Sequence, residues 1–152
     1  MINQHHLKAL RTVCEKLKDA DVNWVLGGST NLALQGVDLN PRDIDILTDR
    51  EGAFTIEKLI KDYKIKSVEF TKSEKIASYQ GKFRVEGVEV EVMGALQIKT
   101  AKAWTKPLKP WRKRILKTEG IEIPVNPLEI ELRAYRRLGR MDRVRKILEV
   151  MP

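Results

Sequence analysis

A Gly-Gly-Ser turn between a predicted strand and a predicted helix is the feature that most constrains this chain. The run Asn23-Trp24-Val25-Leu26 is apolar and rich in strand formers, and residues 29–36 are predicted to form a short helix. Gly27-Gly28-Ser29 therefore lies at the junction. Glycines let the backbone approach a ligand closely, and the free N–H groups at a helix start favour an anion such as phosphate.

A pair of aspartates follows, with 13 residues between Ser29 and Asp43. In the apolar run from Asp43 to Leu47, strand alternation places Asp43 and Asp45 on one face and the isoleucines on the other. Neighbouring carboxylates repel each other, and a cation relieves that repulsion. Oxygen ligands that leave room for phosphate oxygens suit Mg²⁺ or Mn²⁺.

Each half of this pattern has a simpler interpretation by itself. A lone Gly-Gly-Ser is an ordinary turn with a helix N-cap, and a lone Asp-x-Asp is a solvated strand end. In this order and spacing, the two together indicate nucleotide chemistry.

The stretch from Trp24 to Thr48 resembles the DNA polymerase β-like nucleotidyltransferase superfamily, and in particular its minimal and aminoglycoside-type domains. The pattern of that superfamily is a strand, Gly-Gly/Ser, a helix, and Asp-hydrophobic-Asp/Glu on the next strand. The resemblance extends more loosely to about Gly94. It implies an α/β (α+β) fold with a mixed sheet flanked by helices, and C-terminal helices follow here.

The superfamily also needs a third carboxylate from a later strand, and residues 87–93 alternate valines with acids, so that Glu89 and Glu91 share a face. By resemblance Glu91 is the third acid, although many relatives have Asp there. We expect Glu89 to be a solvent-facing strand residue.

The resemblance implies transfer of a nucleoside monophosphate from an NTP to a hydroxyl group by two metal ions. Asp43 and Asp45 would hold both metals, and Glu91 would bind the catalytic one and accept the hydroxyl proton. The implied nucleotide-binding residues are Gly27, Gly28, Ser29 and Arg42. Arg42 has an alternative interpretation as a solvent-facing loop residue.

Length and composition fit one domain over residues 1–152, with a core at about 20–94 and a basic part at 95–152. The chain is 42% hydrophobic and shows neither an apolar run long enough for a membrane span nor a signal-peptide pattern. We therefore expect a cytoplasmic protein without membrane partners. Two histidines argue against a zinc site or a Ser-His-Asp triad, and the single Cys14 is expected in the core.

Positive charge is concentrated in the C-terminal third. Residues 99–152 hold 15 of the 29 Lys and Arg residues but 6 of the 21 Asp and Glu residues. Within Lys99 to Lys117, the basic residues interleave with Trp104 and Trp111, a mixture that binds phosphates and offers rings for stacking. The alternative to anion binding is a basic face that is simply solvated, with Trp104 or Trp111 capping the core.

The acceptor is left open as a small molecule or an RNA bound by the basic third, and a homodimer is possible. A non-catalytic nucleic-acid-binding or toxin–antitoxin-type module that keeps the same fold is the alternative function. A toxin that modifies tRNA would use both the acidic site and the basic third. Retention of all three acids favours the enzyme, because clustered carboxylates repel each other and a binding module has no need of them.

Turn and cap signals complete the expected layout. Glu86-Gly87 and Glu119-Gly120 predict hairpins, the first joining strands at 82–85 and 88–93. Thr48-x-x-Glu51 predicts a capping box, and a last helix is expected to bury Val144, Ile147 and Leu148.

Overall fold

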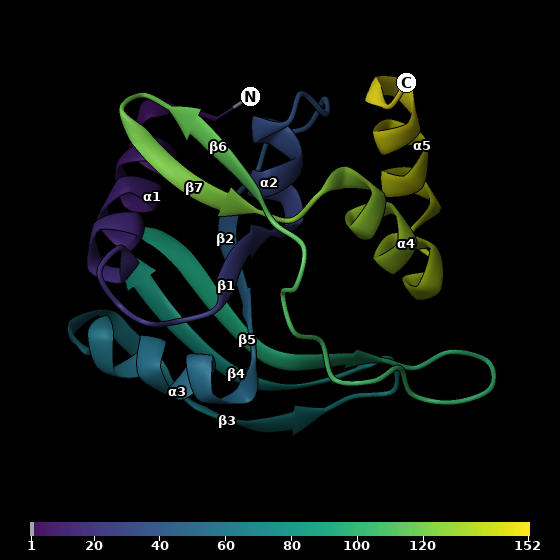
Figure 1. Ribbon diagram of the computed structural model, residues 1–152, viewed down its shortest axis with the longest axis horizontal. Coiled ribbons are helices and arrows are strands. Elements are labelled where there is room, and N and C mark those ends of the chain that lie inside the picture. Colours follow the sequence, from purple (N-terminus) through teal and green to yellow (C-terminus); the bar gives the residue numbers. More distant parts are fainter. Residues whose placement is uncertain (1) are drawn as a thin grey trace.

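The apolar strand-forming runs all enter one sheet in the computed structural model, which describes residues 2–152 (Figure 1). The strand order in this sheet is β3-β4-β5-β2-β1-β7-β6. The strands are β1 (Trp24–Gly27), β2 (Asp43–Thr48), β3 (Lys64–Lys72), β4 (Ile76–Val85), β5 (Val88–Ile98), β6 (Arg114–Thr118) and β7 (Ile121–Val125).

Strand β2 lies at the centre of the sheet, parallel to β5 and antiparallel to β1. The sheet is therefore mixed, and the predicted α/β (α+β) fold is confirmed. In the β2–β5 register Asp43 lies opposite Glu89 and Asp45 opposite Glu91, while across β1 Asp45 lies opposite Gly27. This register brings the turn and all the candidate acids to the middle of the sheet.

Both predicted hairpins form. Glu86-Gly87 has φ values of 51° and 77°, and Glu119-Gly120 has values of 49° and 78°. Two successive residues with positive φ are typical of the tight turns that match strand twist. The strands of the first hairpin are longer than predicted: β4 begins at Ile76 and β5 continues to Ile98, because pairing between the two strands extends a sequence that has little strand alternation of its own.

Five α-helices and one 3-10 turn, η1 (Lys61–Tyr63), are described in residues 2–152. The predicted capping box is wrong. Thr48 ends β2 and its hydroxyl donates to the Asn23 carbonyl, whereas Asp49 caps the next helix by accepting from the Gly52 N–H. The helices are α1 (Gln4–Leu17), α2 (Gly28–Leu34), α3 (Arg50–Leu59), α4 (Leu128–Leu138) and α5 (Met141–Val150).

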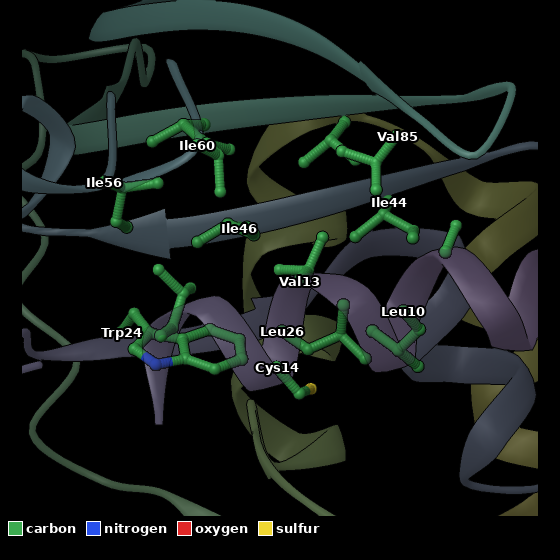
Figure 2. Packing of buried hydrophobic residues seen from close by; sticks show 14 of the residues in the cluster. Leu10, Val13, Cys14, Trp24, Leu26, Ile44, Ile46, Ile56, Ile60 and Val85 are labelled. Carbon is green, nitrogen blue, oxygen red and sulfur yellow. The ribbon is translucent and has the colours of Figure 1, made fainter. Parts of the chain in front are cut away.

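The main core lies between the sheet and helices α1 and α3, which occupy one side of the molecule (Figure 1). Figure 2 shows Leu10 and Val13 of α1 beside Leu26 of β1 and Ile44 of β2. Cys14 is buried in this core, as predicted, and burial raises the pKa of its thiol to about 12.

A second, smaller core joins α2 to the C-terminal helices. Helices α4 and α5 stand on the opposite side of the molecule from α1 and α3 (Figure 1). Leu148 was expected here but is 47% exposed, because the helix turns only one narrow face inward. The buried members are Leu32, Val37, Leu128, Leu132, Val144 and Ile147. No helix in the described part of the chain is long and apolar enough to cross a membrane.

The structure predicts opposite outcomes for two tryptophan substitutions. Trp24 is 7% exposed and Trp111 is 80% exposed. Trp24→Ala should lower the free energy of unfolding by roughly 3 to 5 kcal/mol, because it leaves a cavity. Trp111→Ala should change it by no more than about 0.5 kcal/mol. Urea unfolding of both variants checks this, and a large loss at Trp111 would place that ring in the core.

Candidate active site

The two aspartates project from β2 away from the main core. Ile44 and Ile46 are fully buried on the core side, so Asp43 and Asp45, which alternate with them, face the side of α4 and α5. Both aspartates line the same pocket. The sequence periodicity therefore gave the correct face.

The Gly-Gly turn passes directly over Asp45. Gly28 has φ +66°, and a Cβ built on it would lie 2.2 Å from Asp45 Oδ2. A Cβ on Gly27 would lie 2.8 Å from Leu47 Cδ1. The glycines thus let the turn approach the carboxylate itself, and only glycine combines this backbone conformation with the absence of a side chain.

Helix α2 is fixed to the start of β2 by a buried hydrogen-bond chain. The Thr30 hydroxyl donates to the Asp43 carbonyl at 2.6 Å, and His6 Nε2 lies 2.8 Å from the same hydroxyl. Since the hydroxyl proton is used by Asp43, His6 donates from Nε2. Burial lowers the pKa of His6, which favours this neutral ring. The chain fixes the backbone at Asp43.

Glu131 of α4 lies under the same turn. Its side chain is almost fully buried and accepts from Asn31 Nδ2 at 3.0 Å, from Asn126 Nδ2 at 3.2 Å and from the Gly28 N–H. Burial raises the pKa of Glu131 to about 7 against the opposing effect of these donors. One N–H of the turn is therefore already engaged by the protein.

Asp45 has the most altered pKa of the acids. Burial raises it to about 8, and the charges of Asp43, Glu91 and Glu131 act in the same direction. Arg143 of α5 opposes them. The protein thus holds a carboxylate where its negative charge is unfavourable, which is typical of functional sites.

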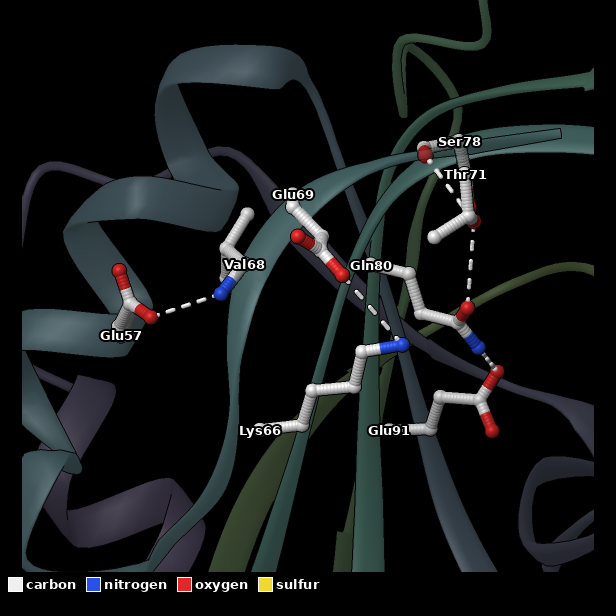
Figure 3. Close-up of polar contacts among 8 residues, drawn as sticks. All are labelled: Glu57, Lys66, Val68, Glu69, Thr71, Ser78, Gln80 and Glu91. Carbon is white, nitrogen blue, oxygen red and sulfur yellow. Dashed lines mark hydrogen bonds and ion pairs between the residues drawn. The ribbon is translucent and has the colours of Figure 1, made fainter.

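Glu91 shares this face through its register with Asp45, but its carboxylate is engaged by the Gln80 side-chain amide (Figure 3). Burial raises its pKa, while Gln80 and Lys82 oppose the change. Glu89 forms an ion pair with Lys82 at 3.8 Å and is partly exposed, as expected for a solvent-facing residue. Within residues 2–152, no three acidic, histidine or cysteine side chains are already arranged to hold a metal ion.

The aspartates open into a pocket of about 560 Å³, a volume typical of ligand sites. Gly28 and Ser29 line it, as do apolar residues of β5 and α4. Gly27, Arg42 and Glu91 do not line it. Arg42 is exposed, so its proposed contact with nucleotide depends on a ligand that extends beyond this pocket.

Basic side chains line the same pocket as the aspartates. They come from two segments, the connection between β5 and β6 and the helices α4 and α5. We call this set the basic wall: Lys106, Lys109, Arg112, Arg133, Arg137, Arg140 and Arg143. Trp111 lines the pocket beside it and is mostly exposed, whereas Trp104 lies away from it, with Lys72 and Lys99 over its ring.

Sequence reasoning missed Glu131 and the arginines of α4 and α5. A signal for Glu131 was present: it lies three residues after Leu128 and four before Tyr135, inside the apolar stripe of its helix. A carboxylate in such a stripe needs buried partners. The arginines gave no comparable signal, because basic residues on a surface helix are common.

Comparisons with known proteins agree with this geometry. The model of the aminoglycoside-2″-adenylyltransferase family matches residues 9–150. The chain belongs to this family. It is 39% identical to TM1012 of Thermotoga maritima, a protein assigned to the nucleotidyltransferases, with 98% of this chain and 94% of that chain covered and a TM-score of 0.87. No curated protein sequence matches the chain.

Two further solved structures share the fold. The lincosamide antibiotic adenylyltransferase LnuA, bound to lincomycin, is 14% identical, with 99% of each chain covered and a TM-score of 0.58. ANT(2″)-Ia in complex with adenylyl-2″-tobramycin is 10% identical, covers 89% of this chain and 76% of its own, and also has a TM-score of 0.58. The predicted nucleotidyltransferase resemblance is confirmed.

The contact between Gly28 and Asp45 leads to a prediction with a matched control. Gly120 has φ +78° and nothing within 4 Å of an added Cβ. Gly120→Ala should therefore lower the free energy of unfolding by only about 1 to 2 kcal/mol, because alanine is strained in the left-handed backbone conformation. Gly28→Ala should lower the free energy of unfolding by roughly 1 to 3 kcal/mol more than Gly120→Ala, because the added Cβ meets the Asp45 carboxylate.

Adding Asp45→Ala to Gly28→Ala should recover the excess, since the carboxylate is then absent. Denaturant titration of the double-mutant cycle measures this coupling. Additive losses would show that Asp45 does not limit the turn.

The altered pKa values predict how stability depends on pH without divalent ions. In the folded state Asp45 and Glu131 keep their protons to about pH 8 and 7, whereas the unfolded chain releases them near 3.8 and 4.5. The unfolded state binds fewer protons, so the free energy of unfolding should fall as pH rises from about 4 to about 8. In Asp45→Asn the fall should be smaller and end near pH 7.

Urea titrations in a chelating buffer across this pH range measure the effect. The exposed Asp62 supplies a control, and Asp62→Asn should keep the wild-type slope. An unchanged slope in Asp45→Asn would contradict the assignment of the buried charge to Asp45.

Proposed function

We propose that this protein transfers a nucleoside monophosphate from an NTP to a hydroxyl group of an acceptor. The observation that carries the proposal is that Asp43 and Asp45 line one pocket together with the Gly28 turn, which lies against Asp45, and with the basic wall. Membership of a family described as adenylyltransferases supports the reaction type.

The acids suit a hard divalent cation. Their donors are all carboxylate oxygens. Burial and, after it, repulsion from the neighbouring acids raise the Asp45 pKa, and Mg²⁺ or Mn²⁺ would offset both effects. Asp43 and Asp45 would hold the ions, with Glu91 as the third ligand. When bound, two such ions neutralise charge on the phosphoryl oxygens and the leaving pyrophosphate.

The chain's own residues position the reactants. Ser29 lies at the pocket beside Gly28 and would bind the β and γ phosphates. The acceptor oxygen attacks the α-phosphorus, the bond from that phosphorus to the bridging oxygen breaks, and pyrophosphate leaves. Glu91 would accept the hydroxyl proton; burial raises its pKa, which favours a proton acceptor over an inert carboxylate.

A pair of neutral substitutions tests the proposal. Asp43→Asn and Asp45→Asn should each reduce transfer by at least about 100-fold, since each removes a ligand that cannot be replaced by an amide. Both variants should remain folded and, without metal, be as stable as wild type or slightly more stable, because the site no longer has to hold that carboxyl group beside the other acids. Transfer of label from each α-labelled NTP to a cell extract measures activity.

Thermal melting with and without Mg²⁺ or Mn²⁺ supplies the second readout. A ligand that binds only the folded state must raise the melting temperature of wild type and should raise that of the two variants far less. Asp62→Asn again serves as the control and should respond like wild type. Equal metal-induced shifts in all four proteins would contradict the site.

A further inference from the structure

The lining of the pocket carries an excess of positive charge. The basic wall has seven cations, whereas the acidic lining residues are Asp43, Asp45 and Glu131. Burial raises the pKa of Glu131 to about 7, which reduces its negative charge further near neutral pH. The pocket is therefore cationic as a whole.

Most of the wall is free to bind an anion. Arg112 is paired with Glu129 at 3.0 Å, and Arg140 with Asp142 at 3.3 Å. Across residues 2–152, the other five members form no ion pair within 4.0 Å: Lys106, Lys109, Arg133, Arg137 and Arg143. Lys109 and Arg143 lie over the rings of Trp111 and Tyr135, but cations without a paired carboxylate at a pocket are available to an external anion.

The wall is also held in place by the fold. The connection that carries Lys106 and Lys109 is tied along β5, since the Thr105 N–H donates to the Ile98 carbonyl and the Leu108 N–H to the Leu96 carbonyl, both at 2.9 Å. On the helical side, Gly139 in the left-handed conformation ends α4, and α5 begins two residues later at Met141. Both segments therefore present their cations to one space.

A bound nucleotide does not account for this excess. The charge of a triphosphate is roughly balanced by the two divalent ions that accompany it. An NTP bound with its two metal ions adds little net charge, so the five unpaired cations of the wall still outnumber the three acidic lining residues. Tobramycin carries several amines and is a polycation, so its approach would place like charges together, which is unfavourable.

We propose that the acceptor is a phosphate-bearing hydroxyl compound and that the basic wall binds its phosphate, so that polycationic aminoglycosides are excluded. This inference rests on the proposed function. The exposed ring of Trp111, with Lys109 Nζ 5.8 Å from its centroid, adds a stacking surface at the mouth of the pocket. The phosphate can belong to a free sugar phosphate or to the end of an RNA chain.

Calorimetric titration of wild type tests this with three probes: ribose 5-phosphate, a short single-stranded RNA with a free 3′-hydroxyl, and tobramycin. Each is added to protein saturated with Mg²⁺ and a non-hydrolysable NTP analogue, and again to protein without nucleotide. At least one anionic probe should bind, more weakly as salt rises, and tobramycin should not. Binding of ribose 5-phosphate indicates a sugar phosphate, and binding of RNA alone indicates a nucleic-acid end.

Two double variants distinguish the effect of the basic wall on anion binding from the effect of the protein's net charge. Arg133→Gln/Arg137→Gln removes two exposed arginines of the wall and should lower the affinity for the anionic probe by roughly tenfold or more. Arg136→Gln/Arg145→Gln removes the same charge from exposed positions of α4 and α5 outside the pocket and should change affinity far less.

Three outcomes would overturn the inference: binding of tobramycin, failure of both anionic probes, or equal weakening in the two double variants. Failure of the proposed function is seen separately, as the absence of any NTP binding with Mg²⁺. The titrations without nucleotide still test the wall in that case.

Discussion

Asp45 is held where its charge is unfavourable, and much of the molecule is arranged around it. The Gly28 turn leaves no room for a Cβ above its carboxylate, and burial together with Asp43 and Glu91 raises its pKa to about 8. Two strand pairings impose this position, because β2 is fixed between β1 and β5. A cation would convert that unfavourable charge into binding affinity.

The C-terminal helices compensate for the acids of the sheet. Glu131 inserts below the turn and is satisfied by three donors, and Arg143 opposes the negative field at both Asp45 and Glu131. Buried side-chain polar atoms all have partners in the part of the chain that the structure describes. The same helices and the turn between them supply four of the seven wall cations, so the segment that stabilises the acids also sets the charge seen by an acceptor. Family membership fixes the scaffold, and the residues that line the pocket set its charge.

Local sequence predicted the centre of the fold well. Glycine turns and short-range alternation depend on neighbouring residues alone, so both hairpins and the faces of β2 followed from them. The helix cap and the ends of β4 and β5 did not follow from local sequence. The carboxylate of Asp49 caps the helix in place of Thr48, and cross-strand pairing sets where β4 begins and β5 ends. The predicted burial of Leu148 was wrong for a related reason, because which residues of a helix are buried depends on what packs against that helix.

The sequence by itself determined that Asp43 and Asp45 share a face beside a glycine turn, because strand period and glycine conformation are local properties. Only the tertiary structure decided what meets them there. Glu131 is more than 80 residues further along the chain than Asp45, and the basic wall combines a connection with two helices. Such contacts depend on sheet order and helix docking, which no local pattern encodes, and they set the charge, and hence the chemistry, of the pocket.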